Sequence, residues 1–274
     1  MKTEEFDSKA AWRRFQLYIR PRRRPRMITV ALYAAASLVL FVSVGVASFL
    51  AGERKITGAL ADVVVEAPAG ATSTVFLPDG SKVTVNAGST LTYSQDYGIS
   101  KRSIRLDGQA FFDVVHNPDC PFEIVSPHLY AYDIGTSFDF CDYSAESCAV
   151  VTITEGNLSV SALGYEGKFN IGEGQKAEFD AVSKVMRKAS ADLRAANSWK
   201  NGELSFNDIS LNDAARLLAR TYGVSVRVSD ASKGAMRVYG SFHIREHTAT
   251  GIMDILCQTG EISYRYDGET IVIS

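Results

Sequence analysis

The sequence has few of the residue types that build metal and disulfide sites, with four cysteines and four histidines among 274 residues. Four cysteines are too few for a disulfide scaffold, and the lack of a Cys-x-x-Cys motif argues against zinc. Cys141 and Cys148 could pair across a hairpin in an oxidising compartment; otherwise we expect isolated buried thiols. His243 and His247 stand four residues apart, but we expect the first on a strand and the second near a helix start. We therefore predict no metal site.

Motifs of the common enzyme classes are also missing. The chain contains no Gly-x-Ser-x-Gly, no His-Glu-x-x-His, no phosphate-binding loop, and no Gly-x-Gly-x-x-Gly that opens a helix after a strand. Its acidic residues are scattered, without a pair whose spacing suggests a general acid and a general base. These absences favour a signalling or binding module that uses no cofactor and is not an enzyme.

One long hydrophobic run is present near the start of the chain. The 24 residues from Met27 to Leu50 carry no formal charge, and a helix of that length crosses a hydrocarbon core of roughly 30 Å. Residues 1–26 hold nine Lys/Arg against three Asp/Glu, a net charge of +6, so the remainder carries −8. The positive-inside bias predicts a single pass through a membrane, with the N-terminal head in the cytoplasm and the rest of the chain exported. A cleavable signal peptide is the alternative, but the run is too long and no clear cleavage site follows it.

The head before this run contains a short amphipathic segment. From Phe6 to Arg20 the pattern predicts a helix on which Trp12, Phe15 and Ile19 share one face. So short a helix is marginal when isolated in water, so the face should dock on lipid or on a partner protein. We expect no direct nucleic-acid contact, because the positive-inside bias already accounts for the arginines next to the membrane.

Beyond the hydrophobic run, the pattern divides the exported part into segments. Residues 51–67 are typical of a stalk, and residues 68–180 show short strands with turn signals every 8–12 residues, which indicates an all-β domain that is a sandwich or a solenoid. Residues 181–199 resemble a linker. Residues 200–274 form a small α+β domain of two βαβ-like units offset by 38 residues, the first helix capped by Ser210 and closed by Gly223. The predicted fold class is therefore mainly β with α+β, behind a single N-terminal transmembrane helix.

Several ordered motifs resemble those of FecR-type transmembrane anti-sigma factors of the Bacteroidetes type. The matching segments are Ala67–Gly70, Val75–Val83, Asn86–Leu91, Leu106–Val114, Pro121–Phe122, Ile134–Phe138, Glu155–Gly156, Trp199–Phe206 and Arg220–Val224. The resemblance runs from about Ala67 to the end of the chain, and it is the ordered series of segments that makes it specific.

The resemblance implies a signal relay across the envelope. The cytoplasmic head would bind an extracytoplasmic-function (ECF) sigma factor, and Trp12 matches a tryptophan common in such heads. The periplasmic part would contact the N-terminal signalling domain of a TonB-dependent, SusC-like outer-membrane transporter. Residues 200–274, similar to the STN-like domains of transporters and secretins, would be the docking surface. Many relatives have several helices in the head, whereas this chain has a single short one, which puts tight sequestration of the sigma factor in doubt.

Gly135-Thr136 matches the step at which some members of this family cleave themselves. A Thr hydroxyl can attack the preceding carbonyl where a strained turn presents it, and Gly is permissive at such a turn. The simpler reading, which the sequence favours, is a Gly-allowed bend before the strand that begins at Ser137.

Two other classes of protein fit the same topology. An anchored periplasmic glycan-binding or envelope-scaffold protein would have saccharide affinity in the β domain and no sigma partner. An anchored hydrolase is the third class, and the missing catalytic motifs argue against it.

Overall fold

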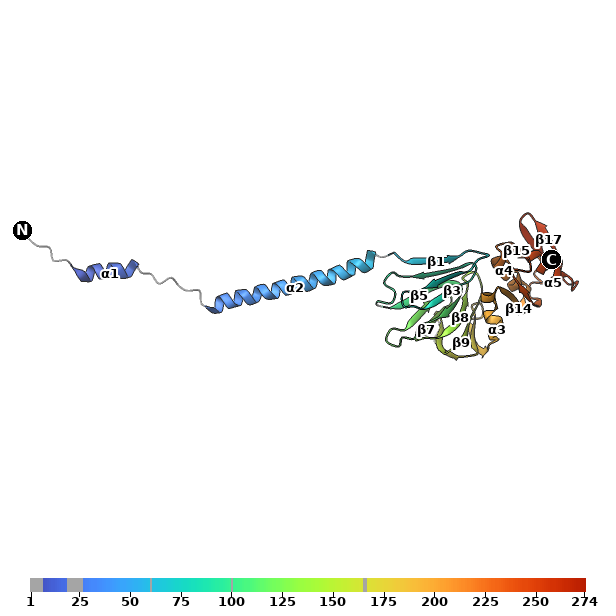
Figure 1. The fold of residues 1–274 in the computed structure, drawn as a ribbon, viewed down its shortest axis with the longest axis horizontal. Coiled ribbons are helices and arrows are strands. Elements are labelled where there is room, and N and C mark those ends of the chain that lie inside the picture. Colours follow the sequence, from blue (N-terminus) through green and yellow to red (C-terminus); the bar gives the residue numbers. More distant parts are fainter. Residues whose placement is uncertain (1–6, 19–26, 60, 100, 165–166) are drawn as a thin grey trace, which may run out of the picture. The chain divides into compact units, whose positions relative to one another are not determined.

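The computed structural model describes residues 7–18, 27–59, 61–99, 101–164 and 167–274. The chain separates into two compact units, residues 1–59 and residues 60–274. Figure 1 shows the order of their elements, coloured along the sequence.

The first unit consists of two helices, α1 (Ser8–Tyr18) and α2 (Met27–Ala59). Asp7 caps α1, because its Oδ1 accepts hydrogen bonds from the backbone N–H groups of Lys9 (3.0 Å) and Ala10 (3.2 Å). Within α2, the stretch Thr29–Leu50 has a mean hydropathy of 2.3 and is long and apolar enough to cross a membrane. The helix continues beyond the predicted span: within the segment 51–67, predicted as a stalk, residues 51–59 belong to α2 and Val63–Ala67 form strand β1.

The second unit begins with thirteen strands that are hydrogen-bonded in one continuous set. Their bounds are β1 (Val63–Ala67), β2 (Ser73–Phe76), β3 (Lys82–Val85), β4 (Ser89–Tyr93), β5 (Arg102–Asp113), β6 (Phe122–Val125), β7 (Leu129–Asp133), β8 (Ser137–Asp142), β9 (Cys148–Glu155), β10 (Asn157–Ala162), β11 (Phe169–Gly172), β12 (Gln175–Asp180) and β13 (Val185–Ser190). They form two layers that share β5. One layer is β1-β4-β5-β6-β7-β10-β11 and the other is β2-β3-β5-β8-β9-β12-β13.

Strand β5 passes from one layer to the other at Gly108. Its first half pairs with β4 and β6, and its second half, from Gly108, pairs with β3 and β8. Gly108 has φ +128°, and a Cβ there would lie 2.2 Å from Ser89 Oγ, so only Gly fits the bend. The sequence pattern places a turn at Asp107-Gly108, which is wrong: the ladder continues on both sides because the glycine bends the strand without ending it.

Side chains from both layers meet in a single core, which makes this part a sandwich. The buried cluster includes Leu91 and Ile104 from the first layer and Val83, Phe112 and Phe138 from the second. Phe112 and Phe138 are fully buried and stacked, with ring centroids 5.1 Å apart. Burying one such ring contributes about 1.5–3 kcal/mol relative to leaving it in water.

The second unit ends in a smaller α+β module with its own buried cluster. Its elements are α3 (Leu193–Asn197), the short 3-10 helix η1 (Ser198–Asn201), β14 (Glu203–Ser210), α4 (Leu211–Tyr222), β15 (Ser225–Val228), β16 (Arg237–His243), α5 (Ala249–Cys257), β17 (Tyr264–Asp267) and β18 (Thr270–Ile273). β14 pairs with β16, while β18 lies between β15 and β17. The segment 181–199, predicted as a linker, contains β13 and α3 and is therefore structured.

The repeat expected from the sequence is present in this module. Ser210 caps α4 through a hydrogen bond from Asp213 N (3.1 Å), and Thr248, 38 residues later, caps α5 through one from Gly251 N (3.1 Å). Gly223 closes α4 in the left-handed conformation with φ +67°. The mainly-β architecture with a small α+β module and one N-terminal apolar helix is thus confirmed.

Candidate functional site

Gly135-Thr136 lies in a tight bend between β7 and β8. Gly135 has φ +142°, and a Cβ on it would lie 2.4 Å from the Cα of His116, so no other residue fits. The chain is tethered on both sides of this peptide. Asn117 N donates to the carbonyl of Ile134 (2.8 Å), and Val114 N donates to the carbonyl of Thr136 (3.0 Å).

Two buried oxygens at this bend have no hydrogen-bond partner among the described residues: Thr136 Oγ1 and Asp133 Oδ2. Asp133 is 2 % exposed, and its other oxygen, Oδ1, accepts from the backbone N–H groups of Ile134 (2.8 Å) and Gly135 (3.1 Å). Thr136 is 6 % exposed and packs against Gly156, where a Cβ would lie 2.5 Å from the Thr136 methyl. Because Gly156 has no side chain, the motif segment Glu155-Gly156 leaves room for Thr136 of the motif segment Ile134–Phe138.

A buried arginine holds the loop that faces this bend. Arg102, 1 % exposed, donates to the carbonyls of Val115 (2.8 Å), Asn117 (3.2 Å) and Cys120, and its Nη1 lies 3.0 Å from Asp79 Oδ2. Burial pushes the pKa of Asp79 upward, but hydrogen bonds from Ser81, Arg102 and Tyr97 outweigh it, and the net pKa is lowered. The sequence analysis did not single out Arg102, because one arginine in a strand gives no sign that it is buried.

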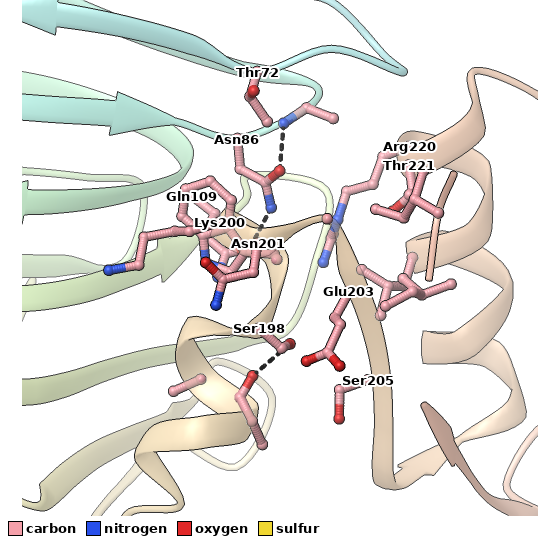
Figure 2. Close-up of a pocket in the computed structure, with 18 of the residues that line it drawn as sticks. Thr72, Asn86, Gln109, Ser198, Lys200, Asn201, Glu203, Ser205, Arg220 and Thr221 are labelled. Atoms are coloured by element: carbon pink, nitrogen blue, oxygen red, sulfur yellow. Dashed lines mark hydrogen bonds between the residues drawn. The ribbon is translucent and has the colours of Figure 1, made fainter. Parts of the chain in front are cut away.

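A cavity of about 880 Å³ lies between the sandwich and the C-terminal module (Figure 2). Asn86 reaches it from the turn after β3 and Gln109 from β5, while Glu203, Ser205 and Arg220 reach it from the C-terminal module. Many of its lining residues belong to the motif segments quoted above, although those segments are far apart in sequence.

A polar relay beside this cavity ends on a buried carboxylate. Asn86 Nδ2 donates to Gln109 Oε1 (2.8 Å), and Gln109 Nε2 donates to Asp139 Oδ2 (3.0 Å). Trp199 Nε1, in η1, donates to Asp139 Oδ1 (2.9 Å), which joins the module to β8. Burial raises the pKa of Asp139 to about 6, although the hydrogen bonds from Gln109 and Trp199 and the positive charges of Lys200 and Arg220 act in the opposite direction.

Arg220, in the last turn of α4, is the second link across the junction. It forms an ion pair with Glu146, and its guanidinium lies 4.2 Å from the ring centroid of Tyr143, both in the β8–β9 hairpin. Its backbone carbonyl accepts from Gly70 N (2.8 Å). The module is therefore attached to the sandwich by charge-assisted and backbone hydrogen bonds around one side chain.

The amphipathic helix carries the residues predicted to bind a partner. On α1, Trp12 is 62 % exposed and Phe15 is 54 % exposed, and their rings stack with centroids 5.6 Å apart. Ile19 lies outside the described residues. The two rings thus form an aromatic surface that the other described residues of α1 leave exposed.

The remaining sequence candidates form no site among the residues that the structure describes. No group of three His, Cys, Asp or Glu side chains there could hold a metal ion. His247 Nδ1 lies 3.2 Å from the backbone carbonyl oxygen of His243. Cys141 and Cys148 are free, as are the other two cysteines, and the suggested disulfide is absent.

Two family models match the chain in order: "FecR protein" over residues 63–159 and "FecR, C-terminal" over residues 203–273. Together they cover more than half of the 274 residues. A search of the curated proteins finds no match. Two crystal structures of a proposed anti-sigma factor from Parabacteroides distasonis, at 1.65 Å and 2.50 Å, share the fold with a TM-score of 0.72 and 21 % identity. They match 77 % and 78 % of this chain and 98 % of their own. The chain belongs to the FecR family.

Proposed function

We propose that this protein is a single-pass inner-membrane regulator of an ECF sigma factor. Its N-terminal head would lie in the cytoplasm and residues 61–274 in the periplasm. The proposal is supported by membership of the FecR family, by similarity in fold to a proposed anti-sigma factor, and by the apolar stretch Thr29–Leu50 behind a basic head. The head would also rest on the lipid bilayer when no sigma factor is bound.

The observation that carries the sigma-binding part is the exposed aromatic pair on α1. Trp12 and Phe15 present stacked rings to solvent, at a helix spacing that places them on one face. Buried tryptophans are the commonest anchors of protein interfaces, and truncating such an anchor costs about 2 kcal/mol or more. Ile19, which the sequence pattern predicts on the same face, is included in the proposed sigma-binding set.

The periplasmic partner in this proposal is the N-terminal signalling domain of a TonB-dependent, SusC-like transporter. The C-terminal module supports this role because its β14–β16 sheet has two strands only among the described residues. An STN-like partner could add a strand to such an edge, since main-chain hydrogen bonds supply affinity in β-augmentation. Arg220 and Trp199, which link the module to the sandwich, would transmit a movement of the docked module to the sandwich.

The sigma-binding part is tested by co-purification of the tagged full-length protein, probed for a bound sigma factor. Trp12→Ala should weaken sigma binding by about 30-fold, the equivalent of about 2 kcal/mol. Leu17→Ala is the matched control, because Leu17 is 76 % exposed but lies about 140° around the helix from Trp12. Equal loss in both variants, or no sigma factor with the parent chain, would remove the proposal and favour an anchored glycan-binding or scaffold protein.

A second activity is supported by the bend at Gly135-Thr136. We propose that the chain cleaves itself there, because the bend fixes a left-handed glycine and leaves the buried Thr136 hydroxyl without a partner. The fragments would stay associated, since β8 pairs with β5 through Gly108–Asp113. Cleavage therefore has to be followed on denaturing gels, with mass spectrometry to show a fragment that begins at Thr136. A parent chain that stays intact would refute it.

A further inference from the structure

We propose that Asp133 is the residue that accepts the proton of the Thr136 hydroxyl during this cleavage. The inference rests on the proposed self-cleavage and names the group that would drive it. Its basis is that a buried carboxylate oxygen and a buried hydroxyl, three residues apart in the same bend, both lack a hydrogen-bond partner among the described residues.

The Asp133 carboxylate is held firmly relative to the peptide that would break. Its Oδ1 accepts from Ile134 N and Gly135 N, and Gly135 is the residue whose carbonyl carbon would be attacked. With Oδ1 engaged, only Oδ2 is free to accept another proton. A buried carboxylate oxygen without a donor is costly, and this one lies in the same bend as a buried hydroxyl that also lacks a partner among the described residues.

Other titratable groups near the bend are less suited to this task. His116 meets Gly135 through its backbone and Cβ, and its residue is exposed. Asp113 already accepts a hydrogen bond from Ser137 Oγ (2.9 Å). Glu155 pairs with Ser137 across the strands and is exposed. Asp133 is the buried carboxylate among them.

The chemistry balances with water as the second reactant. Asp133 takes the hydroxyl proton as Thr136 Oγ1 forms a bond to the Gly135 carbonyl carbon. The bond from that carbon to Thr136 N breaks, and the nitrogen takes the proton from Asp133, leaving an ester and a free amine. Water then hydrolyses the ester, which gives a Gly135 carboxylate and restores the Thr136 hydroxyl.

The test is the cleavage rate of the full-length chain after a pulse of synthesis, read on denaturing gels. Asp133→Asn is nearly isosteric and keeps an oxygen for the two backbone N–H groups, so it removes the base while preserving the bend. We expect it to slow cleavage by about 10²–10⁴-fold. Asp113→Asn, the same change on the neighbouring carboxylate, should cleave like the parent, as should Thr136→Ser, while Thr136→Val should stay intact.

A pH profile separates a proton acceptor from a merely structural residue. In the parent chain the rate should become independent of pH on the alkaline side, because the carboxylate rather than hydroxide removes the hydroxyl proton. In Asp133→Asn the residual rate should rise about tenfold per pH unit, because hydroxide must then remove the proton. Cleavage of Asp133→Asn at the parent rate would overturn this inference and leave self-cleavage standing. A parent chain that is never cleaved, like Thr136→Val, would overturn both.

Discussion

The strongest quantitative prediction concerns the buried carboxylate of Asp139, which is 4 % exposed. Burial raises its pKa to about 6 in the folded protein from an ordinary value of 3.8, a difference of roughly two units, and one unit corresponds to about 1.4 kcal/mol. Between pH 4 and 6 the folded state keeps the proton while the unfolded state has released it. The free energy of unfolding should therefore fall by about 3 kcal/mol as the pH rises through this window.

The segment 61–274 offers a direct optical assay for this titration. The chain has two tryptophans, and only Trp199 lies in this segment, where its indole donates to the Asp139 carboxylate. Trp199 fluorescence in the folded protein should change with a midpoint near pH 6. Urea unfolding at a series of pH values then gives the free energy of unfolding in parallel.

Asp139→Asn is the control that isolates this one group. Carboxylates with lowered pKa, such as Asp79, add stability as the pH rises, and they are common to both proteins. The difference in unfolding free energy between parent and variant should therefore fall by about 3 kcal/mol from pH 4 to 7. A fluorescence midpoint near 4, or a transition near 6 that persists in Asp139→Asn, would refute the assignment of this titration to Asp139.

Two further predictions concern the tethered bend and its supporting loop. Gly135→Ala should destabilise the sandwich by about 2–5 kcal/mol, because the new side chain would have a positive φ and would clash with His116. Gly98→Ala is the control: Gly98 also has a positive φ, +84°, but nothing lies near its Cβ position, so this change should cost about 1 kcal/mol. Thermal unfolding compares them, and equal shifts would show that the clash is relieved. Arg102→Met should cost about 3–5 kcal/mol in urea unfolding, since it leaves the Asp79 carboxylate unpaired and three carbonyls without a donor; a loss below 1 kcal/mol would contradict this reading.

The strands that could be predicted from sequence are those with one buried face. Lys82–Val85 alternates with Val83 and Val85 buried, and Thr270–Ile273 buries its last three residues, so a sequence pattern alone indicates both strands. β13 was missed because Val185–Ser190 is an edge strand with almost every residue exposed, so it carries no alternating pattern. β5 was divided in two because Asp107-Gly108 has the composition of a turn, and only the packing against Ser89 shows that it is a bend within a strand.

The helix caps were predictable, whereas the polar sites were not. Ser210 and Gly223 act locally, so their roles follow from residues a few positions away. The hydrogen-bonded relay joins Asn86 to Gln109, 23 residues apart, and Gln109 to Asp139, 30 residues apart. Trp199, which also donates to Asp139, is 60 residues further along the chain. Nothing in a single sequence indicates which of many Asn, Gln and Asp residues will meet when two sheets fold together.

The motif segments that carry the family resemblance gain a physical meaning from these contacts. A side chain on Gly135 would clash with the backbone of His116, and a side chain on Gly156 would clash with the methyl group of Thr136. The two Gly-containing motif segments therefore meet at one bend. Asp139 lies three residues beyond Thr136 on β8 and receives the Trp199 hydrogen bond from the C-terminal module. This hydrogen bond therefore connects the C-terminal module to the strand that starts at the bend. This arrangement is what a relay needs, because docking at the module and chemistry at the bend would share one short, fully paired strand.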